Sequence, residues 1–106
     1  MVIFSKDADA DRAIMAQILP GNAIDAGGGW MIYALPEAEL AVHPEHGPIR
    51  HELHMMCEDI EDTRDKLIAL GLVCDPVEDL GYGLVSSFAL PGGAKIGFYQ
   101  PRHGRP

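Results

Sequence analysis

Residues 34–43 read ALPEAELAVH, and residues 89–99 read ALPGGAKIGFY. When one extra glycine is allowed in the second stretch, the two align and Leu40 pairs with Ile96. Each stretch has the turn residues and the alternating side chains of a β-hairpin. The repeat predicts an internal duplication, in which each half is too small to bury its own sheet.

Each half also contains one segment with the apolar spacing and the capping residues of a helix. We expect the first helix to begin at Asp7 or Asp9 and to run to about Leu19. The second helix should begin near residues 58–59 and end at Gly71, since glycine readily adopts the left-handed conformation found at helix ends. The two helices have equivalent places in the two halves, in agreement with a duplication.

Strand-like runs surround these helices. They lie at residues 3–4, 29–35, 38–43, 51–57, 72–77, 83–90 and 94–100. The order along the chain is therefore a strand, a helix and several strands, twice over. This order predicts an α+β fold made of two tandem βαβββ modules.

Alternation along the strands assigns side chains to the two faces of the predicted sheet. We expect the large apolar set under the helices: Leu40, Val42, Leu53, Met55, Cys57, Ile96 and Phe98. The opposite face collects Glu39, Ala41, His43, Glu52, His54, Met56, Lys95, Gly97 and Tyr99. If the sheets curve together, this mixed polar face lines a cleft.

The composition is that of one globular domain, with 106 residues, 47% hydrophobic and 23% charged. Sixteen acids against eight bases give a net charge of −8, which opposes binding to nucleic acid or to anionic membranes. The two cysteines are too few for a disulfide-rich secreted scaffold, and we recognise no signal peptide and no membrane-spanning run. We therefore expect a cytoplasmic protein with no nucleic-acid partner and no membrane partner.

The most specific motif is the turn at residues 79–83, DLGYG, followed by residues 89–99. With the module order, it resembles the last turn, hairpin and strand of the vicinal oxygen chelate superfamily. This superfamily includes glyoxalase I, extradiol dioxygenases and bleomycin-resistance proteins. The hairpin match is partial, because Leu90 and Gly92 stand where the superfamily's hairpin has two aspartates.

The resemblance covers nearly the whole chain and implies its organisation. It implies one glyoxalase/bleomycin-resistance/dioxygenase-like domain over residues 1–106, with a first module of about 1–49 and a second of about 50–106. The two modules would form an incompletely closed curved β-sheet with the helices outside. Because small members of the superfamily commonly pair, the resemblance also implies a homodimer.

Metal-dependent members hold a divalent cation with one His or Glu on the first strand and one Glu on the last strand of each module. Carried over to this sequence, the last-strand positions fall on Ala41 and Gly97, and the first-strand positions fall near Val2 and on Glu52. One donor of four remains, so we expect no metal and no cofactor. A different register would use Glu39, on the same face as Ala41, but the internal repeat argues against that register.

Four histidines lie near the predicted junction of the modules: His43, His46, His51 and His54. They could form a metal cluster together with Glu52, or belong to a polar loop exposed to water. We expect the loop, because prolines and a glycine surround His46.

Glu52 and His54 form a further candidate, because residues two apart on a strand share a face. A carboxylate and an imidazole in a cleft could act as base and acid, or could hold a polar ligand. They could equally form a structural ion pair.

The aromatic candidates are Tyr82, between two glycines of the turn, and Tyr99, on the cleft-facing side of its strand. The candidate ligand-binding residues are Glu52, His54, Glu39, His43, Tyr82 and Tyr99, and no catalytic residue is assigned. Because two glutamates face Lys95 on this surface, we expect a neutral or cationic ligand with a flat apolar part.

Three functions are compatible with these features. The first is a metal-free protein that binds a small organic molecule in its cleft. The second is an enzyme of the superfamily (a lyase, an isomerase or a dioxygenase) that uses Glu52 and His54, with or without a displaced divalent metal. The third is a structural or interaction module whose cleft is vestigial.

Overall fold

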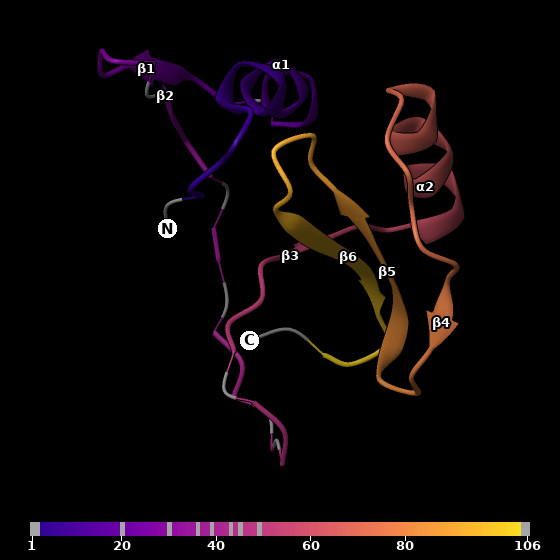
Figure 1. Cartoon of the computed structure of the whole chain (residues 1–106). Helices are drawn as coiled ribbons and strands as arrows, with labels where there is room; N and C mark the ends of the chain where they lie inside the picture. The colour runs from indigo at the N-terminus through magenta and orange to yellow at the C-terminus, as the bar shows by residue number, and fades with distance from the viewer. Residues whose placement is uncertain are drawn as a thin grey trace.

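The computed structural model describes residues 3–19, 21–29, 31–35, 37–38, 40–42, 44, 46–48 and 50–104. In chain order its elements are α1 (Ala8–Ile18), β1 (Ala23–Asp25), β2 (Met31–Tyr33), β3 (His54–Met56), α2 (Ile60–Ala69), β4 (Glu78–Asp79), β5 (Gly83–Ala89) and β6 (Lys95–Pro101). Figure 1 shows the resulting fold, which is α+β, as predicted.

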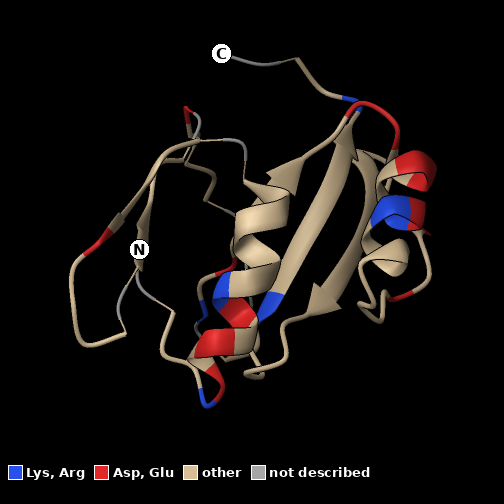
Figure 2. Ribbon diagram, turned by 90° about the horizontal axis from the view of Figure 1, so that it is seen from above, with Lys and Arg blue, Asp and Glu red and all other residues tan. Residues whose placement is uncertain are grey.

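Both helices begin and end close to the predicted residues. The Asp7 carboxylate accepts a hydrogen bond from the backbone N–H of Ala10, and the Asp59 carboxylate accepts one from Asp62. These contacts satisfy N–H groups that a helix start leaves without a partner. Gly71 follows α2 with φ of +90°, as expected for a left-handed stop. Acidic residues gather in the first turn of each helix (Figure 2), where the helix dipole favours them.

The second half of the chain forms a four-stranded sheet in the order β3-β6-β5-β4. β3 pairs with β6 in parallel, and β5 pairs antiparallel with both β6 and β4. The strand-helix-strand-strand-strand order predicted for this half is therefore present in residues 54–101.

The hydrophobic core lies between this sheet and the helices. Phe88, Phe98, Ile60 and Ile96 are each only 1% exposed, and Met15 and Leu19 of the α1 region join them. Leu53, Met55 and Cys57 are partly buried against the same core. These positions confirm the face predicted for β6 and for residues 53–57.

The first half of the chain differs from the expected strands. The run at residues 3–4 is not in a strand, and neither are residues 38 and 40–42 of the run at 38–43. Leu40 and Val42 were expected under the helices, but they are 93% and 91% exposed, so that prediction was wrong. The physical reason is that a strand needs a hydrogen-bonded neighbour, and none of the described residues pairs with this run.

Two smaller differences concern short strands. β1, which pairs antiparallel with β2, was not expected. In the run expected at residues 72–77, Cys74 makes an isolated bridge to Phe88, and regular pairing starts only at β4.

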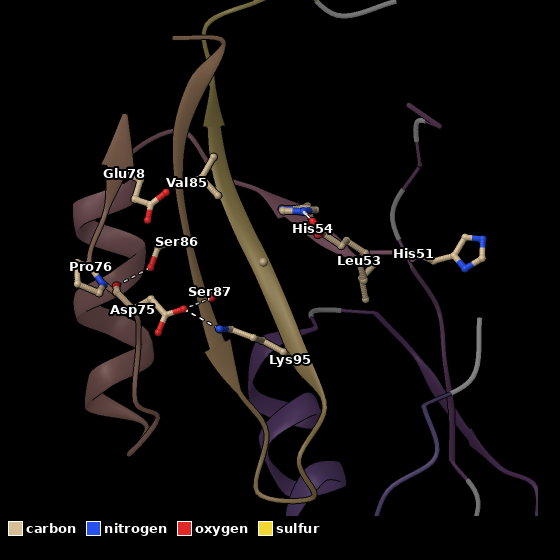
Figure 3. A pocket seen from close by; sticks show the side chains of 12 residues that line it. His51, Leu53, His54, Asp75, Pro76, Glu78, Val85, Ser86, Ser87 and Lys95 are labelled. Atoms are coloured by element: carbon tan, nitrogen blue, oxygen red, sulfur yellow. Dashed lines mark hydrogen bonds and ion pairs between the residues drawn. The ribbon is translucent and has the colours of Figure 1, made fainter. Parts of the chain in front are cut away.

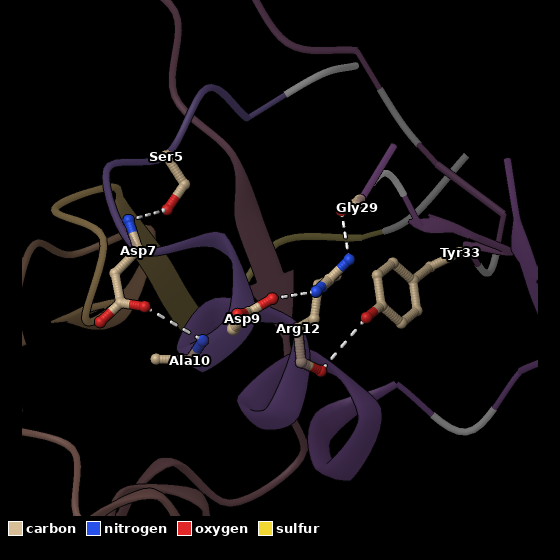
Figure 4. A network of polar contacts seen from close by, with 7 residues as sticks. All are labelled: Ser5, Asp7, Asp9, Ala10, Arg12, Gly29 and Tyr33. Carbon is tan, nitrogen blue, oxygen red and sulfur yellow. Dashed lines mark hydrogen bonds and ion pairs between the residues drawn. The ribbon is translucent and has the colours of Figure 1, made fainter. Parts of the chain in front are cut away.

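The β1–β2 hairpin is attached to α1 and lies apart from the four-stranded sheet (Figures 1 and 4). The Arg12 guanidinium contacts the Asp9 carboxylate and donates to the carbonyl oxygen of Gly29. The Tyr33 hydroxyl donates to the carbonyl oxygen of Arg12 at 3.1 Å. The hairpin is therefore held to α1 by polar contacts, and Tyr33 also packs against the core.

One buried carboxylate connects α1 with the last hairpin of the sheet. The backbone N–H of Gly92, in the turn between β5 and β6, donates to Asp11 Oδ1 at 2.6 Å, and Asp11 is only 6% exposed. A Cβ atom at residue 92 would lie 2.4 Å from Asp11 Oδ2, so this contact requires glycine. This contact fixes α1 relative to the second half of the chain.

Within the described part of the chain, neither helix has the length and apolarity needed to cross a membrane.

Candidate functional site

A cavity of about 380 Å³ lies over the face of the four-stranded sheet that is opposite the Phe88 and Phe98 side chains (Figure 3). Its lining residues come from all four strands or from the segments beside them. They are His51, Glu52, Leu53, His54, Asp75, Pro76, Glu78, Val85, Ser86, Ser87, Lys95 and Gly97. Along β6, Lys95 and Gly97 face the cavity and alternate with the buried Ile96 and Phe98, as expected for a sheet with one covered face.

One wall of the cavity contains Glu52 and His54, and the Glu52 carboxylate is also held by Arg50, which lies outside the lining. Arg50 Nε donates to Glu52 Oε1 at 2.7 Å, and His54 Nε2 lies 2.7 Å from Glu52 Oε2. The hydrogen bond from Arg50, followed by the one from His54, lowers the pKa of Glu52 below its ordinary value. Glu52 is therefore ionised at neutral pH.

The imidazole of His54 lies over Gly97, its register partner on β6. A Cβ atom at residue 97 would be only 2.3 Å from His54 Nδ1, so the ring occupies space that a side chain would need. Because a carboxylate can only accept, the bond to Glu52 requires the proton on Nε2, and Nδ1 is left facing the Gly97 backbone. The ring also makes an edge-on contact with Tyr99, with centroids 5.8 Å apart.

The opposite wall is built around Asp75. Its Oδ2 atom accepts from Ser87 Oγ at 2.5 Å and forms an ion pair with Lys95 Nζ at 2.9 Å. Of these contacts, the one from Ser87 lowers the pKa of Asp75 most, followed by the one from Lys95. The Asp75 backbone is fixed as well, since its carbonyl oxygen accepts from Ser86 Oγ and from Arg64 Nε.

The charge of the lining is more acidic than basic. Three carboxylates, those of Glu52, Asp75 and Glu78, face a single ammonium group, that of Lys95, and the imidazoles of His51 and His54. Since one acid on each wall is held in its ionised form by a lowered pKa, an anionic ligand would meet repulsion from both sides.

The predicted site residues are brought together only in part. Glu52 and His54 share a face, as predicted, and both line the cavity, while Tyr99 touches His54 from β6. Tyr82 lies in the turn before β5, is 48% exposed and is outside the cavity lining. Glu39 and His43 lie outside the described residues.

Six lining residues were not singled out from the sequence: Asp75, Pro76, Glu78, Val85, Ser86 and Ser87. The residues next to Asp75 in the sequence do not indicate that it belongs to a site, because its partners Ser87 and Lys95 come from two later strands. Only the alternation of β5 could have placed Ser87 on the same face as Gly97, its register partner on β6.

The residues at the superfamily's metal positions do not fit a metal. Ala41 has no donor atom, and at Gly97 the space for a carboxylate is filled by the His54 ring. The position near Val2 lies outside the described residues. Across the described ranges, no group of three or more His, Cys, Asp or Glu side chains could hold a metal ion.

Comparison with known proteins gives a match in structure. No protein-family model matches the sequence, and no curated protein sequence does either. A lactoylglutathione lyase from Agrobacterium tumefaciens superposes with a TM-score of 0.67 at 12% identity, covering 94% of this chain and 90% of that one. TnmS3, an antibiotic-binding protein from Streptomyces sp. CB03234, gives a TM-score of 0.64 at 21% identity, with the same two coverages.

A third solved structure names the domain type. A glyoxylase/bleomycin resistance protein/dioxygenase domain from Frankia sp. EAN1pec gives a TM-score of 0.62 at 17% identity, covering 92% of this chain and 85% of that one. This chain has the glyoxalase/bleomycin-resistance/dioxygenase fold. The resemblance to the vicinal oxygen chelate superfamily that the sequence indicated is thus confirmed in the fold. Proteins with this fold include both a lyase and a binding protein, so the fold alone does not assign the chemistry.

Proposed function

We propose that this protein binds a small organic molecule, without a metal, in the cavity between the Glu52–His54 wall and the Asp75–Lys95 wall. The volume of about 380 Å³ is within the range of small-molecule sites, roughly 300 to 1,000 Å³. The similarity in fold to an antibiotic-binding protein supports a binding role.

The fixed polar lining of the cavity carries this proposal. Glu52 is held by Arg50 and His54, and Asp75 is held by Ser87 and Lys95. Carboxylates that are fixed in place by such partners form a polar lining suited to recognising a ligand.

The acidic lining favours a neutral or cationic ligand with hydrogen-bond donors. Glu52 and Asp75 retain acceptor capacity beside their present partners, because each carboxylate can accept about four hydrogen bonds. A flat apolar part of the ligand would rest on Tyr99, which contacts the His54 ring. Tyr82 lies outside the cavity lining, and Met56, expected on this face, lines a different cavity. Glu39 and His43 stay part of the predicted site.

The test is a thermal-shift screen with matched cationic, neutral and anionic aromatic compounds. A ligand that binds only the folded state raises Tm by mass action. We expect cations to stabilise more than anions, and Glu52→Gln should reduce the difference. Glu61→Gln, which changes an exposed acid of α2 outside the cavity, is the matched control. Stronger stabilisation by anions would contradict the proposal for the ligand class.

Metal content provides a second test. Protein purified without chelator should contain no stoichiometric transition metal, as measured by elemental analysis, because the donors at Ala41 and Gly97 are missing. One tightly bound Zn, Ni, Mn or Fe per chain that is lost in Glu52→Ala would overturn the metal-free proposal.

The alternative is an enzyme of the superfamily. The observation in its favour is the 2.7 Å contact between Glu52 and His54, a carboxylate–imidazole pair of the kind used in acid–base catalysis. Chemical turnover of a bound compound that is lost in both Glu52→Gln and His54→Gln would favour this alternative. Binding without turnover favours the binding protein.

We also propose that the chain is one domain of two duplicated modules and that it forms a homodimer. The described first half buries few apolar side chains: Phe4, Leu40 and Val42 are each more than 90% exposed. Apolar surface of this kind is stabilised by burial against another chain. A second copy of this chain would bury these exposed side chains.

A further inference from the structure

A second cavity, of about 240 Å³, lies on the helix-covered side of the four-stranded sheet. The buried rings of Phe88 and Phe98 line it from β5 and β6, and Leu67 and Leu70 line it from α2. Ile18, in the last turn of α1, borders it as well. Since Phe88 and Phe98 point away from the Glu52–His54 wall, this cavity is separate from the first one.

The interior of this cavity is apolar and rich in sulfur. Met55 and Cys57 contribute side chains that are partly buried against the core. Burial raises the pKa of the Cys57 thiol, so the thiol is neutral at physiological pH. Met and Cys sulfur atoms make favourable contacts with the edges of aromatic rings.

The few polar groups of the lining are engaged with other groups of the protein. Lys66 Nζ forms an ion pair with Asp62 at 2.9 Å, and the Gln17 side-chain amide donates to the carbonyl oxygen of Ala13 at 3.3 Å. The charge of Lys66 is therefore balanced locally. A cationic ligand would find no carboxylate in this lining, and an anionic ligand would have to displace Asp62 from Lys66. Either ligand would also lose its hydration.

We propose that this second cavity is a binding site for a neutral, flat aromatic molecule of one or two rings. Size supports this assignment, because an apolar cavity of about 150 Å³ stays dry and binds benzene. With about 240 Å³, the cavity has room for a bicyclic ring. The partly exposed sulfur-bearing side chains of Met55 and Cys57 favour an aromatic guest over an aliphatic one of the same size.

The test uses indole as the neutral probe, with tryptamine as its cationic and indole-3-acetate as its anionic analogue. Indole should raise Tm by about 2 °C or more at concentrations well above its Kd, and both charged analogues should raise Tm less. Leu70→Trp, which fills the cavity from the end of α2, should abolish the effect of indole. Glu52→Gln, in the other cavity, should leave it unchanged.

Three results would overturn the proposal: no stabilisation by indole up to its solubility limit, stabilisation that persists in Leu70→Trp, or stabilisation that disappears in Glu52→Gln. If Leu70→Trp does not fold, NMR of the wild type decides. Indole-induced shifts at Cys57, Leu67 and Phe98 support the second cavity, whereas shifts confined to Glu52 and Ser87 exclude it. This site does not depend on the proposed function of the first cavity.

Discussion

The Glu52 carboxylate holds two neighbours in place at once, Arg50 on one oxygen and His54 on the other. Its side chain is 49% exposed, so water screens these contacts and each contributes only a small amount to stability. Their main effect is geometric. The carboxylate fixes the tautomer and the orientation of the imidazole, and the imidazole in turn forms part of the cavity wall.

Replacing Arg50 should change the titration of Glu52. The pKa of Glu52 is lowered in the folded state, so its stabilising effect is present above its ordinary value of 4.5 and is lost as the pH falls through the folded-state pKa. In Arg50→Gln we expect the pKa of Glu52 to rise, measured by NMR of the side-chain carboxyl carbon. Arg102→Gln, which removes the partner of Asp79 instead, should leave Glu52 unchanged. An unaltered Glu52 titration in Arg50→Gln would show that the contact is not formed in solution.

Gly97 provides the second prediction at this scale. Gly97→Ala places a Cβ atom 2.3 Å from His54 Nδ1, so the ring must rotate away and its bond to Glu52 must break. Because a side chain rather than the backbone gives way, we expect a cost of about 1 kcal/mol, at the low end for overpacking.

The measurements for Gly97→Ala are Tm and the proton contacts between His54 and Tyr99, which should disappear. Gly104→Ala is the control, since no atom lies within 4 Å of a Cβ there. Retained contacts between the two rings in Gly97→Ala would show that His54 does not lie over Gly97.

At the scale of elements, α2 is the helix that covers the sheet and contributes the fully buried Ile60. The Asp59 carboxylate caps it by accepting from the Asp62 N–H at 3.1 Å. Asp59→Ala should lower the free energy of unfolding by about 1 kcal/mol, measured by urea denaturation. Asp65→Ala, an exposed acid in the same helix, should change it far less. Equal effects of the two substitutions would contradict the capping role.

Sequence reasoning succeeded where the signal was local. The caps at Asp7 and Asp59 and the stop at Gly71 are each set by neighbouring residues, and both helices were predicted within a residue or two. The strands β5 and β6 were predicted from alternation bounded by glycines, which is also local.

The errors and omissions involve pairing between distant residues. Residues 38–42 alternate like a strand, but alternation does not supply the neighbour that a strand requires. In the candidate site, the position of His54 over Gly97 follows from the register of β3 on β6, and the Asp75–Lys95 pair follows from the path of the chain into β4. Neither relation can be read from the spacing of residues along the sequence.

At the scale of the molecule, the two halves contribute unequally to the core. Of the ten buried hydrophobic residues in the described part of the chain, only Met15 and Leu19 precede residue 50. The radius of gyration is 14.5 Å, against roughly 13 Å for a compact chain of this length. Apolar side chains of the first half are correspondingly exposed.

A homodimer is therefore the expected state in solution. Sedimentation at tens of micromolar should give about twice the chain mass of 11.5 kDa. Leu40→Lys combined with Val42→Lys should shift the equilibrium towards monomer, because charges oppose the burial of that segment. Lys substitution of the exposed Val73, in the second half, is the control. A wild-type monomer with no concentration dependence would contradict the dimer.

The hydrogen bond between Gly92 and Asp11 has a consequence for the order of events during synthesis. A chain is made from its N-terminus, so α1 leaves the ribosome long before residue 92 has been added. The Asp11 carboxylate is only 6% exposed in the folded chain. It stays hydrated and lacks its backbone donor until the β5–β6 hairpin has left the ribosome. The first helix is thus held in its final place by a hairpin residue that is translated 81 residues after Asp11. Chains halted before residue 92 should leave that helix as readily cleaved by protease as an unfolded segment.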